Sequence, residues 1–237
     1  MLYLIGLGLN QHSLTHEGKL ALKKCKKIYL ESYTVSFPYT PKELELTLAR
    51  KITLLTREKV ESDFLIKEAK KQAIALLVYG SPLFATTHST LLEDCLTAKV
   101  KTKVLLNASV FDALSLTGLH VYKFGKIASM PQWEKNFTPD SFLDIVKENK
   151  KTHGHSLILI DIDLTCQDAI SQLQTVLASK KMSLDKLLIC SKMGTTHQKI
   201  HYNTLKVLKQ RDIPKPFCII IPAKLHFTEE SFLKFFS

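Results

Sequence analysis

The sequence has no apolar run long enough to cross a membrane. Its longest apolar stretches, 73–79 and 217–221, are the length of a β-strand, far short of the ~20 residues that a bilayer-spanning helix needs. The N-terminus is apolar but has neither the basic leader nor the small-residue cleavage site of a signal peptide. We therefore expect a cytoplasmic chain that is neither exported nor embedded in a membrane.

Paired cysteines are also missing. The five cysteines are scattered, with no C-x-x-C arrangement, and most lie within apolar runs. This pattern predicts buried thiols in a reducing compartment. Two histidine pairs, His153/His155 and His197/His201, lack carboxylate or thiol neighbours at ligand spacing. The sequence therefore predicts no metal site.

Several common catalytic motifs do not occur. The chain has no G-x-x-x-x-G-K-[ST] phosphate-binding loop and no G-x-S-x-G nucleophile turn, which removes the usual nucleotide hydrolases and serine hydrolases. Gly6-Leu7-Gly8 follows an apolar run, but Gln11 stands where a dinucleotide-binding fingerprint has its third glycine. By itself, this G-x-G is equally well explained as a plain turn between a strand and a helix.

Positive charge is abundant, with a formal net charge of +11. This balance favours an acidic partner or nucleic acid without saying anything about the fold. Lys19, Lys23 and Lys27 recur every four residues and would form a stripe on one helix face. A solvated face is the favoured interpretation over a docking surface. No RNA-binding signature is present, so nucleic acid is an unlikely partner.

Apolar runs alternate with segments of helical periodicity through most of the chain. Runs that are apolar without alternation predict strands buried on both faces, and therefore a mostly parallel sheet with helices on each side. Thr40-Pro41-Lys42-Glu43 predicts a helix start with a capping box. In the first half the expected strands are 2–5, 28–33, 52–56, 73–79 and 104–107.

The second half is expected to repeat this alternation of strands and helices, with strands at 157–162, 187–190 and 217–221. The fold class is therefore α/β, as two α/β domains with a cleft between them. The predicted domains are 1–115 and 116–237, with the boundary placed where the first strand–helix series ends.

Three segments at predicted strand ends could carry chemistry. They are 6–9, 79–88 and 107–113, and ligands of open α/β sheets bind at the carboxyl ends of strands. Thr86, Thr87 and His88 cluster at a predicted helix start and are candidates to orient substrate or cofactor. The alternative is a capped helix with solvent-facing polar residues.

Together, these and further segments resemble the archaeal diphthine synthase family, within the broader group of tetrapyrrole methylases. The resemblance covers nearly the whole chain in order and spacing. It is carried by the opening Leu2-Tyr3-Leu4-Ile5-Gly6-Leu7-Gly8-Leu9, Ala85-Thr86-Thr87-His88, Ser109 with its flanks, 117–125, Trp133, Lys147-Glu148-Asn149, Ile160-Asp161-Ile162 and Ile221-Pro222-Ala223-Lys224-Leu225-His226.

The resemblance implies a homodimeric methyltransferase that uses S-adenosylmethionine and releases S-adenosylhomocysteine. Its implied substrate is translation elongation factor 2 carrying a 3-amino-3-carboxypropyl group on a histidine, whose amino group is methylated repeatedly. The positions that match the family's cofactor contacts are Leu9, Ser81, Phe84, Ser109, Val110, Ile160, Met193 and His226.

The chain departs from the family pattern at one of these positions. Gly80-Ser81-Pro82 stands where the family usually has Gly-Asp-Pro, so a hydroxyl replaces a carboxylate that could attract the cationic cofactor. Two alternatives stay open. One keeps the fold and changes the acceptor to a corrin precursor or an RNA ribose, and the other is a non-catalytic protein that binds RNA or the ribosome.

Overall fold

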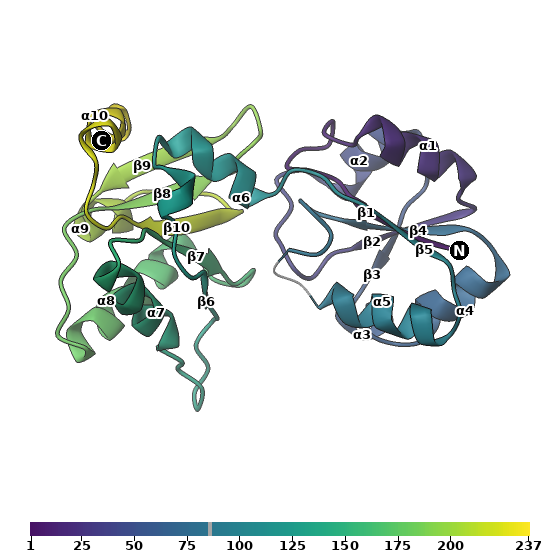
Figure 1. The fold of residues 1–237 in the computed structure, drawn as a ribbon, viewed down its shortest axis with the longest axis horizontal. Helices are drawn as coiled ribbons and strands as arrows, with labels where there is room; N and C mark the ends of the chain where they lie inside the picture. Colours follow the sequence, from purple (N-terminus) through teal and green to yellow (C-terminus); the bar gives the residue numbers. More distant parts are fainter. Residues whose placement is uncertain (85–86) are drawn as a thin grey trace. The chain divides into compact units, whose positions relative to one another are not determined.

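The computed structural model describes residues 1–84 and 87–237. The chain divides into two compact units, Met1–Asp112 and Ala113–Ser237 (Figure 1). The boundary expected from the sequence, after residue 115, lies three residues beyond Asp112.

The sheet of the N-terminal unit is parallel throughout, in the strand order β3-β2-β4-β1-β5. Its central strand β4 is buried at every position, as expected for a strand covered on both faces. Because all its strands run the same way, their carboxyl ends lie along one edge. The strands are β1 (Leu2–Gly6), β2 (Lys27–Glu31), β3 (Thr53–Leu55), β4 (Ile74–Val78) and β5 (Thr102–Leu105).

Helices cover both faces of this sheet (Figure 1). Side chains alternate between the faces along β1, with Tyr3 and Ile5 in one core cluster and Leu2 and Leu4 in the other. One face carries α1 (His16–Lys24) and α2 (Pro41–Leu48), and the other carries α3 (Arg57–Val60), α4 (Phe64–Lys71) and α5 (His88–Thr97). A short helix, α6 (Val110–Ala113), leads into the second unit.

Local sequence signals account for the helix ends. The predicted capping box is confirmed, because the Thr40 hydroxyl accepts the Glu43 N–H while the Glu43 carboxylate accepts the Thr40 N–H. The predicted lysine stripe is wrong at its last member. Helix α1 ends at Lys24, and Lys27 begins β2, where it pairs with Glu68 at 2.5 Å.

The C-terminal unit has a mixed sheet, in the order β6-β7-β10-β8-β9. Only the β6–β7 pair is parallel among the described strands, so the expectation of a mostly parallel second sheet is wrong. Residues 192–198 connect β8 to β9, too few for the crossover that parallel neighbours need. The strands are β6 (Ala128–Met130), β7 (Ser156–Ile160), β8 (Leu187–Ser191), β9 (Lys199–Asn203) and β10 (Phe217–Ile221).

The core of this unit forms where two long amphipathic helices, α7 (Ser141–Lys151) and α8 (Cys166–Ser179), pack against the sheet. The unit also has the helices α9 (Leu205–Lys209) and α10 (Phe227–Leu233) and the 3₁₀ turns η1 (Leu114–Thr117), η2 (Val121–Lys123) and η3 (Lys234–Phe236). All five cysteines are buried free thiols, which confirms that prediction. No helix within the described residues is both long and apolar enough to span a membrane.

Candidate functional site

Three turns meet at the carboxyl edge of the N-terminal sheet. They follow β4, β1 and β5, which are neighbours in the sheet. The first two turns are joined by a pair of backbone hydrogen bonds, Gly8 N–H to the Gly80 carbonyl at 3.2 Å and Gly80 N–H to the Gly8 carbonyl at 3.0 Å. Both glycines have a φ near +70° (72° and 69°), which other residues rarely adopt.

The turns are packed too closely for larger residues. A Cβ atom placed on Gly6 would lie 2.6 Å from the Gly80 carbonyl oxygen. The Asn107 side-chain amide then fixes the third turn by donating to the carbonyls of Gly6 and Ser13, both at 3.0 Å. This edge is therefore held in place before any ligand arrives.

The five cofactor positions expected in the N-terminal unit all lie on these turns. Two of them, Ser81 and Ser109, are buried hydroxyl residues, and Phe84 is 55% exposed. The Phe84 ring meets Phe111 edge-on, with centroids 5.2 Å apart. The edge thus offers hydroxyl groups beside an aromatic surface. The five positions are Leu9, Ser81, Phe84, Ser109 and Val110.

Two of these positions take part in local hydrogen bonds. The Leu9 carbonyl accepts the Tyr79 hydroxyl at 3.1 Å, which ties the first turn to the second. Ser109 bonds the Asp112 carboxylate through its N–H at 2.7 Å and its hydroxyl at 3.1 Å. The Asp112 carboxylate is therefore directed to the start of α6 as a cap.

A polar cluster adjoins these turns at the end of β2. Glu31 is fully buried there, and its Oε1 atom accepts the hydroxyl of Thr34. Among the described residues, neither Glu31 Oε2 nor the buried hydroxyl of Tyr33 has a hydrogen-bond partner. The Arg57 guanidinium lies 5.3 Å from the centroid of the Tyr33 ring. Burial raises the pKa of Glu31 to about 7, although Thr34 and Arg57 act against the rise.

This cluster reaches the predicted catalytic candidates through α3. Arg57 pairs with Glu61 at 3.6 Å, and the Glu61 carboxylate accepts the Thr87 hydroxyl at 3.4 Å. Next to Thr87, His88 is fully buried, and its Nδ1–H donates to the Pro82 carbonyl at 3.1 Å. Burial lowers the pKa of His88, so a neutral ring holds the turn that carries Ser81. Thr86 lies outside the described residues.

The remaining cofactor positions, in the C-terminal unit, do not all come together. Ile160 ends β7 and Met193 follows β8, at the end of the sheet where β10 begins. His226 follows the other end of β10, and the five residues of that strand span about 13 Å. Within this unit, the sheet therefore separates His226 from Ile160 and Met193.

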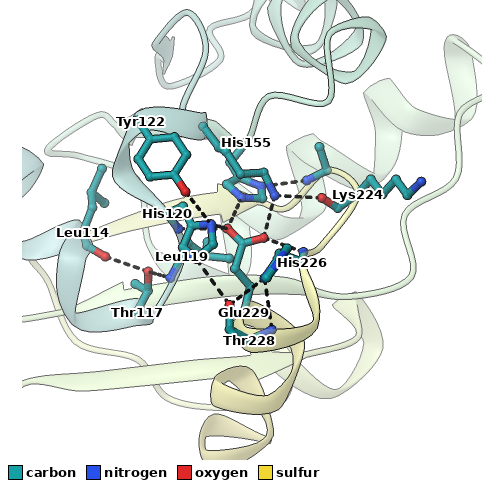
Figure 2. A network of polar contacts seen from close by, with 12 residues as sticks. Leu114, Thr117, Leu119, His120, Tyr122, His155, Lys224, His226, Thr228 and Glu229 are labelled. Carbon is teal, nitrogen blue, oxygen red and sulfur yellow. Dashed lines mark hydrogen bonds and ion pairs between the residues drawn. The ribbon is translucent and has the colours of Figure 1, made fainter.

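His226 belongs to a network centred on a second buried glutamate, Glu229 (Figure 2). The Glu229 carboxylate accepts backbone N–H groups from His226 at 2.7 Å and from His120 at 2.8 Å. It also accepts the Lys123 ammonium at 2.6 Å and His155 Nε2 at 3.0 Å. Burial alone would raise the pKa of Glu229, but these donors hold it far below its usual range.

The protonation of His155 follows from its contacts. Its Nδ1 atom accepts the Ala223 N–H at 3.0 Å, so the ring proton must be on Nε2, which donates to Glu229. Burial lowers the pKa of His155, and the charges of Lys123 and His120 add to the decrease, although Glu229 acts against it. A neutral histidine therefore satisfies both neighbours. The network joins η2, the start of β7 and the start of α10.

Comparison with known proteins decides the family. Residues 1–209 match the family of Tetrapyrrole (Corrin/Porphyrin) Methylases. A diphthine synthase of Methanococcus maripaludis is 35% identical, over 99% of this chain and 98% of that protein. A diphthine methyl ester synthase of Schizosaccharomyces pombe is 33% identical, over 99% and 93%. A crystal structure of diphthine synthase, 29% identical, has a TM-score of 0.89 and covers 100% of this chain and 95% of its own.

The chain belongs to the tetrapyrrole methylases, in the diphthine synthase branch. The predicted resemblance, the fold of two α/β units and the methyltransferase class are thereby confirmed. Within this methylase, the role of each cofactor position and of Thr86, Thr87 and His88 stays a prediction.

Sequence reasoning missed the two glutamates of the methylase that have no exposed surface. Glu31 stands inside the predicted strand 28–33, where a charged residue within an apolar run was the available signal. Glu229 has the spacing of a capping box, but its N-cap residue is His226 and not one of the usual cap residues. Its burial depends on contacts from residues more than 70 positions earlier in the chain, which no local pattern reveals.

Proposed function

We propose that this methylase transfers methyl groups from S-adenosylmethionine to the amino group of the 3-amino-3-carboxypropyl histidine on translation elongation factor 2. The observation that carries the proposal is similarity to diphthine synthases along almost the full length of both proteins. This similarity includes the terminal α10 region, beyond the residues that match the broader methylase family.

The three turns at the edge of the N-terminal sheet fit part of the cofactor. Their glycines let a ligand approach the backbone, and the exposed Phe84 offers an aromatic face to an adenine ring. The hydroxyls of Ser81 and Ser109 can hydrogen-bond its polar groups. In the C-terminal unit, Ile160, Met193 and His226 stay predicted cofactor positions by resemblance, although the sheet separates His226 from the other two. When bound, the cofactor supplies an electrophilic methyl group on a sulfonium.

The chemistry asks little of the protein beyond alignment and proton removal. A chain-terminal α-amino group titrates near ~7.7–8, and an amine beside a carboxylate titrates higher, so only a small fraction is unprotonated and nucleophilic at neutral pH. The protein has to hold the nitrogen in line with the methyl group and exclude water. An elaborate catalytic constellation is therefore unnecessary, which agrees with the absence of the common hydrolase motifs from the sequence.

Two other acceptors follow from specific observations. The name of the Schizosaccharomyces pombe relative includes a methyl ester, so a carboxylate oxygen is a second candidate acceptor. The name of the family keeps a corrin precursor as the third. The full-length similarity to diphthine synthases favours the protein substrate over the corrin. We also propose a homodimer in the cytoplasm, where elongation factor 2 works.

Labelled methyl transfer separates these acceptors. The protein is incubated with methyl-labelled S-adenosylmethionine and elongation factor 2 carrying the precursor, beside a corrin precursor and ribosomal RNA. Label on the modified histidine, stable to mild base, supports amine methylation, and base-labile label indicates an ester. Label confined to RNA or corrin would overturn the substrate, and no cofactor binding by calorimetry would favour a non-catalytic role.

Replacing Ser81 with aspartate tests the cofactor position. If the cofactor's cationic part lies beside this residue, Ser81→Asp should strengthen binding by about 1.5–3 kcal/mol, the worth of a hydrogen bond to a charged group. This corresponds to roughly a ten- to hundred-fold lower Kd by calorimetry. Ser81→Asn is the neutral control of equal size. Equal affinity for both variants would place the cation elsewhere.

A further inference from the structure

Glu31 is a buried acid whose contacts leave half of its carboxyl group unused. Its Oε1 atom is bonded by Thr34, whereas Oε2 has no partner among the described residues. The hydroxyl of Tyr33, also buried and without a described partner, belongs to the same cluster. Buried polar atoms are nearly always paired, so unpaired ones point to a role that stability does not explain.

The fold contains a contrasting case. Glu68 lies on the same face of this sheet, near the amino end of β2, and its carboxylate bonds Lys27 at 2.5 Å and Tyr29 at 3.1 Å. A glutamate beneath this sheet can therefore be bonded by both a cation and a phenol of the protein itself. At Glu31, neither the neighbouring phenol of Tyr33 nor any cation is bonded to the carboxylate among the described residues. A cation supplied by a ligand, such as an ammonium group, fits the place of the missing partner of the Glu31 carboxylate.

Glu31 also lies at the right distance from the proposed cofactor site. Strand β2 pairs with β4, with Leu30 opposite Leu77, so Glu31 is level with the end of β4 and the turn that carries Ser81. Strand β1 is one strand further along. Neighbouring strands are about 4.8 Å apart, which puts the ends of β2 and β1 about 10 Å apart. An amine ~3 Å from the carboxylate and a methyl group ~3–3.5 Å beyond it fit this span.

We propose that Glu31 binds the substrate's ammonium group and takes up its proton, and that Tyr33 hydrogen-bonds the same nitrogen. This inference rests on the proposed function. The ammonium gives one proton to the Glu31 carboxylate. The lone pair freed on the nitrogen attacks the methyl carbon. The C–N bond forms, the C–S bond breaks, and neutral S-adenosylhomocysteine leaves. The methylated nitrogen is a cation again and must lose a further proton before the next transfer.

The electrostatics of the cluster support this use. The substrate amine stands beside a carboxylate and therefore titrates above the ~7.7–8 of a chain-terminal α-amino group, and the pKa of Glu31, raised to about 7 by burial, brings the two groups closer. The raised pKa lowers the cost of moving a proton from amine to carboxylate, and the proton leaves for solvent at neutral pH before the next cycle. The other titratable groups around it are Tyr33, Arg57 and Glu61, and burial together with Glu31 raises the pKa of Tyr33 to about 12. Tyr33 therefore stays protonated and does not compete as a base.

Access requires a local movement, because Glu31 has no exposed surface. In the turn after β2, Tyr33 and Thr34 are partly exposed. Thr34 bonds Glu31 through its hydroxyl. An incoming ammonium at Oε2 therefore displaces this turn without breaking any bond of that oxygen to a described residue.

The test is Glu31→Gln, measured on precursor-bearing elongation factor 2 with labelled S-adenosylmethionine. We expect kcat/KM at pH 7 to fall by about 100-fold or more, the usual contribution of a general base. The Kd for S-adenosylmethionine, measured by calorimetry, should stay within about two-fold, because the cofactor turns are untouched. The matched control is Glu68→Gln, which removes a buried carboxylate beneath the same sheet and should leave kcat/KM at its parent value.

The pH profile separates a proton acceptor from a structural residue. In the parent protein kcat/KM should rise with an inflection near pH 7, the pKa of Glu31. In Glu31→Gln the inflection should move up to the amine's own pKa, above ~7.7–8, with part of the rate recovered beyond it. A purely structural role predicts a lower rate with an unchanged profile, and that result would overturn the proposal.

The outcomes distinguish this inference from the proposed function. If the parent binds no S-adenosylmethionine or methylates no elongation factor 2, the proposed function fails. If the parent is active and Glu31→Gln matches it in rate and profile, the inference alone fails. Should Glu31→Gln not fold, Tyr33→Phe replaces it, with an expected three- to ten-fold loss in kcat/KM from one missing hydrogen bond. An unchanged rate in Tyr33→Phe would then refute the amine site.

Discussion

Each of the two units contains one glutamate with no exposed surface, and the two are held in opposite ways. Glu229 in the C-terminal unit accepts four donors and remains charged, with a pKa far below the usual range. Glu31 in the N-terminal unit accepts Thr34 on one oxygen, and burial raises its pKa to about 7. The same residue type is thus a structural anion in one unit and a weak acid in the other.

The difference shows how hydrogen-bond supply sets the role of a buried acid. Four donors fill the acceptor sites of a carboxylate, which offsets the cost of removing its charge from water. Such a group connects segments and has no capacity left for a ligand. A carboxyl group with an open oxygen is costly for the fold, and its proton exchanges near neutral pH. The first arrangement stabilises a fold, and the second suits chemistry.

The largest expected effect comes from breaking the saturated glutamate. Glu229→Gln removes the charge that Lys123 pairs with and replaces an acceptor by an NH₂ group facing other donors. Removing one partner of a buried ion pair costs about 3–5 kcal/mol. Urea unfolding followed by Trp133 fluorescence measures the loss, because the sole tryptophan packs against the C-terminal core. A loss below about 1 kcal/mol would show that the network contributes little.

The unsaturated glutamate should respond with the opposite sign. A pKa raised from 4.5 to about 7 means that the folded parent loses about 3 kcal/mol of stability as pH rises through this window. Glu31→Gln has no such group, so its stability relative to the parent should increase by about that amount between pH 4.5 and pH 8. Urea unfolding followed by circular dichroism at both pH values tests this. A difference independent of pH would show that Glu31 ionises normally.

The sequence predicted the parallel N-terminal sheet well because burial on both faces leaves a local mark, an apolar run without alternation. Strand β9 leaves no such mark, since Lys199–Asn203 is polar and lies at the sheet edge. The direction of β10 was equally hidden, because Phe217–Ile221 is apolar whether its neighbours run parallel or antiparallel. The positions of the buried strands could therefore be read from the sequence, but the edge strands β6 and β9 and the pairing direction could not.

The candidate site divides in the same way. The turns after β1, β4 and β5 could be placed from glycines and strand ends, and the parallel topology brings them to one edge. The state of both glutamates depends on distant segments: Arg57 acts on the pKa of Glu31 through its charge, and His120 and His155 bond Glu229. Local periodicity carries no information about such contacts.

Acidification should sharpen the contrast between the two units. Because the pKa of Glu229 is lowered, its stabilisation is present above the unfolded value near ~4.3 and is lost as pH falls through the folded value. The lowered pKa of His155 adds loss of the same sign as pH drops below ~6.5. Trp133 fluorescence should therefore show the C-terminal unit weakening below pH ~6.5 and further below pH ~4.3, whereas protonation of Glu31 favours the N-terminal unit. Equal losses of stability in both units on acidification would contradict this prediction.

The smallest effect is expected where the motif of Glu229 recurs on the surface. Glu43 caps α2 through the same pair of reciprocal bonds, with Thr40 as its N-cap, but both residues are exposed. Water replaces a lost surface hydrogen bond, so Glu43→Gln should shift the urea midpoint only slightly. Hydrogen bonds to Thr40 lower the pKa of Glu43, so any small loss should appear at neutral pH and disappear once the parent's glutamate is protonated. If Glu43→Gln destabilises the protein as much as Glu229→Gln, the capping box and not the burial of its carboxylate would explain the role of Glu229.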